Sequence, residues 1–121
     1  MAHILVIDDE DPVRNMLRQI LERAGHEVAE APDGNVGMQH VREHQIELVV
    51  TDILMPEQEG IETIRTLHRD FPQLKVLAIS GGGRRRTLDV LIEAEFFGAH
   101  RILAKPFERT EFLEAVSTLL T

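Results

Sequence analysis

Two kinds of hydrophobic segment alternate along the chain. Short, nearly continuous apolar runs rich in β-branched residues are typical of strands buried on both faces. Longer segments, in which apolar residues recur every three or four positions, are typical of amphipathic helices. Strands are expected at 3–7, 26–31, 47–53, 74–80 and 100–104. Helices are expected from Pro12 to Gly25 and over about 35–44, 60–70, 85–97 and 108–120.

Turn and capping residues separate these segments. Pro12 suits the first turn of a helix, and the acidic Glu10 or Asp11 before it is expected to cap that helix. Strands separated by helices imply right-handed crossovers and a parallel sheet covered on both sides. The sequence therefore predicts an α/β fold of three layers, with residues 1–121 forming one domain.

Charge and composition narrow the possible partners. Thirteen Lys and Arg against 21 Asp and Glu give a net charge of −8, which disfavours nucleic acids and anionic membranes. The absence of Cys excludes disulfides, thiolate metal sites and cysteine nucleophiles. No apolar run approaches the ~18 residues that a membrane span needs. We expect a cytoplasmic protein with no direct contact to nucleic acid or membrane.

Polar residues follow four of the predicted strands. Asp8 and Asp9 follow the first strand, Asp52 ends the third, Ser80 ends the fourth and Lys105 follows the fifth. In open α/β sheets, ligands bind outside the carboxyl ends of the strands, where all these residues should meet. The sequence thus predicts a site of three carboxylates, a hydroxyl and an ammonium group.

This set of groups suits phosphoryl transfer. Neighbouring carboxylates repel one another, and an all-oxygen site selects a hard cation such as Mg²⁺. Asp52 stands alone at a central strand end and is the best candidate for an aspartyl-phosphate nucleophile. Asp8 and Asp9 lie side by side in the sequence, which suits metal binding.

Four motifs carry a resemblance to a known family. The motifs are VIDDE (6–10), TDILMP (51–56), AISG (78–81) and AKPF (104–107), in this order at the predicted strand ends. Together they resemble the receiver domain of two-component response regulators, over essentially the whole chain. The resemblance implies a flavodoxin-like, doubly wound (βα)5 fold with a five-stranded parallel sheet. It also implies a phosphorylation-dependent switch, more than a turnover enzyme.

The resemblance assigns the acidic residues by position. Asp52 would be the phosphoacceptor. Mg²⁺ would be held by Asp8, Asp9 and Asp52 together with the backbone carbonyl of Leu54. The phosphoryl donor would be a sensor histidine kinase or a histidine phosphotransfer protein. Phosphorylation would change the affinity for a downstream protein through the surface of the fourth helix, fifth strand and fifth helix.

Three further residues are assigned in the same way. Lys105 would pair with the phosphoryl group, the hydroxyl of Ser80 would bind a phosphoryl oxygen, and the backbone amide of Gly81 would help. The bond between Lys105 and Pro106 would be cis, as is usual in this family.

The sequence departs from the family pattern in two respects. Ile102 stands where the family often has an aromatic residue that turns inward on activation, so this chain lacks that toggle. Leu54 and Gly82 stand where polar side chains can position the hydrolytic water. We therefore expect a long-lived phosphoryl group.

Two other functions remain open at this point. A flavodoxin-like cofactor binder is disfavoured because the acidic loop after the first strand would repel a phosphate. An Mg²⁺-dependent phosphatase with an Asp nucleophile usually has a second Asp two residues later, where this chain has Leu54. Flavin absorbance and turnover of a phosphoester, respectively, would indicate these functions.

Two further groups of residues have patterns that suit other roles. Arg84, Arg85 and Arg86 lie near a predicted helix start, where cations are disfavoured, and they form either a solvated loop or a contact for an acidic partner. His40 and His44 are four residues apart on a predicted helix, a spacing that suits metal chelation. With no third ligand evident in the sequence, we interpret the pair as a solvated helix face.

Overall fold

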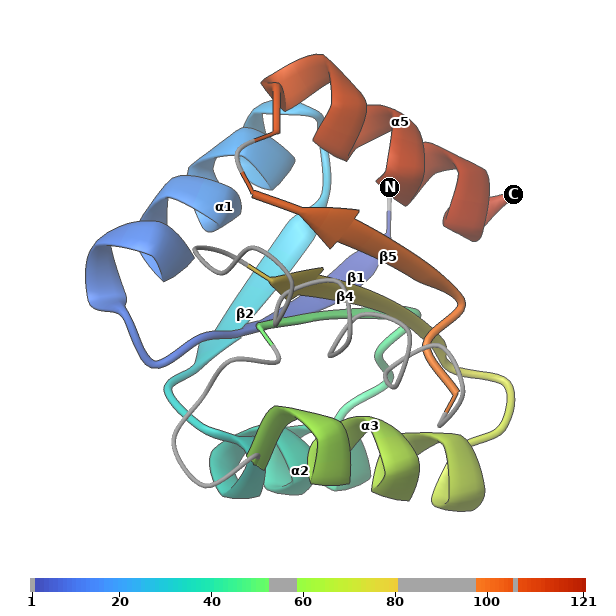
Figure 1. Ribbon diagram of the computed structural model, residues 1–121. Coiled ribbons are helices and arrows are strands. Elements are labelled where there is room, and N and C mark those ends of the chain that lie inside the picture. Colours follow the sequence, from blue (N-terminus) through green and yellow to red (C-terminus); the bar gives the residue numbers. More distant parts are fainter. Residues whose placement is uncertain (1, 53–58, 81–97, 106) are drawn as a thin grey trace.

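The computed structural model of this chain describes residues 2–52, 59–80, 98–105 and 107–121 (Figure 1). Its strands are β1 (His3–Ile7), β2 (Glu27–Ala31), β3 (Leu48–Asp52), β4 (Lys75–Ser80) and β5 (Arg101–Ala104). Its described helices are α1 (Asp11–Arg23), α2 (Gly34–Glu43), α3 (Glu59–Asp70) and α5 (Arg109–Leu120). The helix expected over 85–97 lies outside the described residues.

The strands form one parallel sheet in the order β2-β1-β3-β4-β5. The predicted doubly wound parallel sheet is therefore confirmed, and the strand boundaries agree with the prediction to within one residue. In this order β1 and β3 are neighbours in the middle of the sheet. Their carboxyl ends coincide, because Ile7 pairs with Thr51 in register. Residues that follow these two strands are thus brought together.

Helices cover both faces of the sheet. Figure 1 shows α1 and α5 on one face and α2 and α3 on the other. The strand β1 divides its side chains between the two: Ile4 and Val6 pack with α1 and α5, whereas Leu5 and Ile7 pack with α2 and α3. All four are at most 1% exposed. Because burial of each such side chain contributes about 1.5–3 kcal/mol, this strand anchors both cores.

Capping side chains define where α2 and α5 begin. The side chain of Asp33 accepts a hydrogen bond of 2.9 Å from the backbone amide of Val36 and so caps α2. Glu108 and Glu111 form a capping box at the start of α5. Among the described residues, no helix has the length and apolar character that crossing a membrane requires.

Candidate functional site

Two buried aspartates meet at the carboxyl ends of the central strands. Asp8 directly follows β1 and is 1% exposed, and Asp52 ends β3 and is 6% exposed. The fold alone places them side by side, because β1 and β3 pair in parallel. The sequence prediction that these two carboxylates converge agrees with the structure.

Glu10 is the third carboxylate of this group. Oxygen atoms of Asp8, Glu10 and Asp52 all lie within 4.8 Å of one another. The sequence predicts Glu10 or Asp11 as the cap of α1, and the backbone of Glu10 does occupy the N-cap position. Its side chain, however, makes no capping hydrogen bond. Its backbone amide instead donates to Asp8 Oδ1 at 2.9 Å. The sequence interpretation missed this carboxylate because the capping role explained its position.

Asp9 lies at the margin of the group. Its side chain is exposed, and it does not belong to the set of three carboxylates. Its charge still acts on the site, since Asp9 contributes to raising the pKa of Asp8. The predicted role of Asp9 as a metal ligand therefore remains a prediction.

Burial makes the charged form of Asp8 unfavourable. The pKa of Asp8 is raised to about 6, mainly by desolvation and further by the negative charges of Asp52 and Asp9. The backbone amide of Glu10 and the charge of Lys105 act in the opposite direction. Carboxylates this close together repel one another at neutral pH, and a bound cation would relieve that repulsion. The donors are all carboxylate oxygens, which fits a hard divalent ion such as Mg²⁺.

Lys105 supplies a positive charge at the same edge. It follows β5, and its Nζ lies 3.9 Å from Asp52 Oδ2. The side chain of Lys105 is 23% exposed, so its charge is partly withdrawn from water. This arrangement leaves the ammonium close to any group that is attached to Asp52.

The remaining predicted site residues are described only in part. Ser80 ends β4 and pairs with Ala104 at the same edge of the sheet, but its side chain lies outside the described part of the structure. Leu54, Gly81 and Pro106 also lie outside the described residues. Their assigned roles stay predictions.

Arg14 fixes the loop that carries the acids, a role that the sequence did not predict. Its guanidinium donates to the backbone carbonyl of Asp8 at 2.8 Å and to Asp11 Oδ1 at 2.6 Å. It also donates to Glu30 Oε1 at 3.1 Å. The position of Arg14 on an amphipathic helix does not predict this contact. The contact with Asp8 depends on how the loop between β1 and α1 turns.

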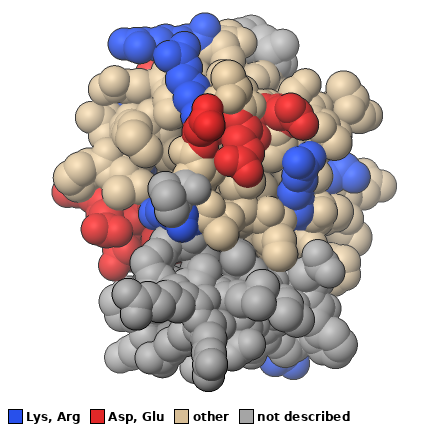
Figure 2. Space-filling model, turned by 45° about the horizontal axis from the view of Figure 1, so that its top comes forward, with Lys and Arg blue, Asp and Glu red and all other residues tan. Residues whose placement is uncertain are grey.

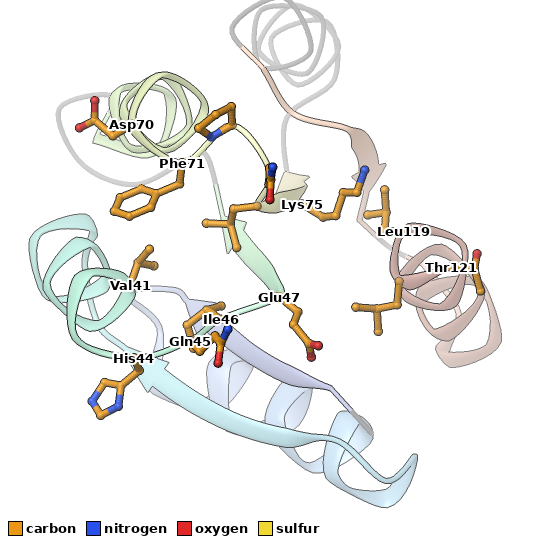
Figure 3. A pocket seen from close by; sticks show the side chains of 14 residues that line it. Val41, His44, Gln45, Ile46, Glu47, Asp70, Phe71, Lys75, Leu119 and Thr121 are labelled. Carbon is orange, nitrogen blue, oxygen red and sulfur yellow. The ribbon is translucent and has the colours of Figure 1, made fainter.

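A separate hollow lies away from these acids. It has a volume of about 760 Å³ and is lined at the amino-terminal edge of the sheet by residues such as Ile46, Glu47 and Lys75 (Figure 3). The carboxylate site is at the opposite edge, at the ends of the same strands. This hollow therefore takes no part in the chemistry of Asp52.

Comparison with known proteins decides the family. Residues 4–117 match the model of the response regulator receiver domain. The chain belongs to this family. It is 35% identical to the chemotaxis protein CheY of Bacillus subtilis, over 99% of both chains. It is also 33% identical to the DNA-binding transcriptional regulator NtrC of Azospirillum brasilense, over 98% of this chain but only 24% of that protein.

Solved structures agree with this assignment. A response regulator receiver domain protein from Clostridium thermocellum superimposes with a TM-score of 0.90 at 31% identity, covering 99% of this chain and 94% of that one. The receiver domain is a phosphorylation-dependent switch of two-component signalling, which favours this function over the cofactor binder and the phosphatase. Receiver domains bind Mg²⁺ at an acidic pocket, and Asp8, Glu10 and Asp52 form such a pocket here.

Proposed function

We propose that Asp52 is the phosphoacceptor of this receiver domain and that residues 1–121 act as one switching unit. The observation that carries this proposal is the environment of Asp52. Its carboxylate is 6% exposed, lies beside those of Asp8 and Glu10, and has the ammonium of Lys105 3.9 Å away. Among the described acids, only Asp52 combines a central strand end, acidic neighbours and a nearby cation.

The chemistry follows from these groups. An oxygen of the Asp52 carboxylate forms a bond to the phosphorus of a phosphohistidine on a kinase or phosphotransfer protein. The phosphorus–nitrogen bond breaks, and the imidazole of the donor takes up a proton from water. Lys105 stabilises the negative charge of the phosphoryl oxygens, since its Nζ already lies near Asp52 Oδ2. The hydroxyl of Ser80 and the amide of Gly81 bind the same oxygens.

The acidic residues would hold Mg²⁺. Asp8, Asp9 and Asp52 with the carbonyl of Leu54 form the proposed ligand set, and Glu10 adds negative charge beside it. The ion, when bound, neutralises the carboxylates and the transferring phosphoryl group. Asp9 must turn inward to reach it, which costs little for an exposed side chain.

The phosphorylated domain would act on another protein. A receiver domain requires a kinase or phosphotransfer protein upstream and a target downstream, and we propose that the target is a protein in the cytoplasm. Figure 2 shows a group of acidic side chains, flanked by basic ones, on the face that carries α5; the exposed acids of this helix and its N-cap are Glu108, Glu111 and Glu114. An acidic face supports a protein target, since nucleic acid would be repelled.

Acetyl phosphate provides the direct test of this proposal. Incubation with acetyl phosphate and Mg²⁺ should add one phosphoryl group to the intact mass of the wild type. Asp52→Asn should abolish the addition, and so should EDTA. Asp33→Asn alters the N-cap of α2, which follows β2 at the side of the sheet opposite to β5 and Lys105; it is the matched control and should be phosphorylated normally. Absence of a mass gain in the wild type would overturn the proposal.

A further inference from the structure

Two histidine rings stack at the end of α2. The ring centroids of His40 and His44 are 4.3 Å apart and the ring planes differ by 28°. The spacing is fixed by the backbone, because the amide of His44 donates to the carbonyl of His40 at 2.9 Å. Two imidazoles one helical turn apart on the same face can bind one metal ion together. The sequence alone showed no third ligand for this pair.

The structure places a third histidine opposite the pair. His3 and Glu27, the first residues of β1 and β2, are partners in register. Both face the α2 side of the sheet, since His3 alternates with Leu5 and Ile7, which pack in the core on that side. His3, Glu27, His40 and His44 all line one cavity of about 200 Å³. Three imidazoles from two different elements thus surround a single space.

The local chemistry favours the neutral form of His40 and orients the ring of His3. Burial, followed by the neighbouring His44, lowers the pKa of His40, and the neutral ring is the form that binds a metal. His3 Nδ1 lies 3.1 Å from Glu27 Oε2. A carboxylate at one ring nitrogen orients the imidazole and leaves the other nitrogen available, as in many metal sites.

We propose that this cavity binds a divalent transition-metal ion of the Zn²⁺ class. His40, His44 and His3 are the three ligands of the ion, and Glu27 orients His3. Tetrahedral coordination with Zn–N bonds of about 2.0–2.1 Å puts ligand nitrogens roughly 3.3 Å apart. The nitrogens of the three histidines do not lie within 4.8 Å of one another in this structure. The lone pairs of the stacked rings of His40 and His44 also run nearly parallel, so at least one of these rings must turn about its side-chain torsions to face the ion. His3 must also rotate into the cavity, which its 54% exposed side chain allows.

This site differs from the carboxylate site in place and in donors. It lies at the amino-terminal edge of the sheet, opposite to Asp8 and Asp52. Its ligands are nitrogens, which suit Zn²⁺ and its neighbours, whereas Mg²⁺ prefers oxygen. His44 and Ile46 line both this cavity and the larger hollow, but Figure 3 shows the ring of His44 directed away from the larger hollow. Saturating Mg²⁺ will therefore occupy the carboxylates and leave the histidines open.

Cobalt binding in the presence of Mg²⁺ tests the proposal. We expect Co²⁺ to produce the intense visible absorption of a tetrahedral, nitrogen-rich site, and Zn²⁺ to abolish it by displacement at one equivalent. His40→Ala and His44→Ala should each weaken Zn²⁺ binding about 100-fold. His3→Ala and Glu27→Gln should each weaken Zn²⁺ binding roughly 10-fold, which is the lower end of the effect seen when a residue that supports a metal site is lost.

Two controls make the outcome decisive. His68→Ala removes an exposed histidine of α3 and should leave Zn²⁺ binding unchanged. Asp52→Asn should also leave it unchanged, since it alters only the carboxylate site. Phosphorylation by acetyl phosphate reports that each histidine variant is folded. Wild-type affinity in His40→Ala or His44→Ala, no Co²⁺ band in the wild type, or loss of Zn²⁺ binding in Asp52→Asn would overturn the proposal.

Discussion

The guanidinium of Arg14 donates a hydrogen bond of 2.8 Å to the backbone carbonyl of Asp8. Arg14 is on the first turns of α1, so this contact ties the helix to the loop that carries the acidic pocket. Its side chain is only 15% exposed, and its bonds to Asp11 and Glu30 hold the guanidinium in place. The position of the Asp8 carboxylate therefore depends on a residue that is neither a proposed metal ligand nor a proposed phosphoryl-binding residue.

Replacement of Arg14 should weaken Mg²⁺ binding. We expect Arg14→Ala to lower the affinity for Mg²⁺ roughly tenfold, because a charge-assisted hydrogen bond contributes about 1.5–3 kcal/mol. Arg18→Ala is the matched control. Arg18 Nε also contacts Glu30, at 2.8 Å, but none of its described contacts reaches Asp8. Mg²⁺ titration with both variants checks this, and equal losses would show that the contact to Asp8 has no special role.

Asp8 should lower the stability of the metal-free protein at neutral pH. Its pKa is about 6 in the folded state and 3.8 in the unfolded chain, so the folded state binds the extra proton between these values. The Asp8 contribution to stability is therefore favourable at about pH 4 and is lost as pH rises through 6. Asp8→Asn should raise the free energy of unfolding at pH 7 by about 3 kcal/mol in EDTA.

Denaturant unfolding at several pH values measures this effect. The difference between wild type and Asp8→Asn isolates one group, because the other carboxylates titrate in both proteins. The difference should shrink as the pH falls from 7 to 4 and should reverse in saturating Mg²⁺, which binds the wild type better. A difference independent of pH would contradict the raised pKa.

Replacing Asp9 should lower the affinity for Mg²⁺ more than replacing Glu10 does. The proposed ligand set contains Asp9, whereas Glu10 lies in the carboxylate group as a source of charge. Asp9→Asn should lower Mg²⁺ affinity at least about tenfold, since it removes a ligand, and Glu10→Gln only a few-fold. Titration of both variants decides this order. The opposite order would make Glu10 the ligand.

Gly98 should be hard to replace. It has a φ of +127°, and a Cβ at this position would lie 2.5 Å from the Cγ and 2.6 Å from the Cβ of His68, of which His68→Ala removes the Cγ. Gly25 has a similar φ of +97° but open space around it, so Gly25→Ala measures the backbone strain alone. We expect Gly98→Ala to cost at least about 1 kcal/mol more than Gly25→Ala. Thermal unfolding compares them, and His68→Ala should restore part of the loss.

The phosphoryl group should be long-lived. Leu54 and Gly82 offer no polar side chain that could position the hydrolytic water. After removal of acetyl phosphate, the intact mass should therefore decay slowly. Replacing Leu54 by Asn should accelerate the decay several-fold. A wild-type half-life as short as that of the fastest chemotaxis regulators would refute this prediction.

Much of the fold could be predicted because strands such as His3–Ile7 are apolar on both faces and end abruptly in acids. Parallel pairing then brings Asp8 next to Asp52, and this too was predictable. The contact of Arg14 with Asp8 and the turn of Glu10 toward the aspartates could not be predicted. Both depend on the path of one loop. The meeting of His3 with His40 and His44 likewise depends on the sheet register.

Chemical localisation of the phosphoryl group tests the central claim most directly. Borohydride reduces an aspartyl phosphate to homoserine, which peptide mass spectrometry assigns to a single residue. After treatment with acetyl phosphate and Mg²⁺, homoserine should be found at position 52, in place of Asp52, and at no other aspartate. Homoserine at position 8 or 9 instead, or a phosphorylated residue other than aspartate, would contradict the account.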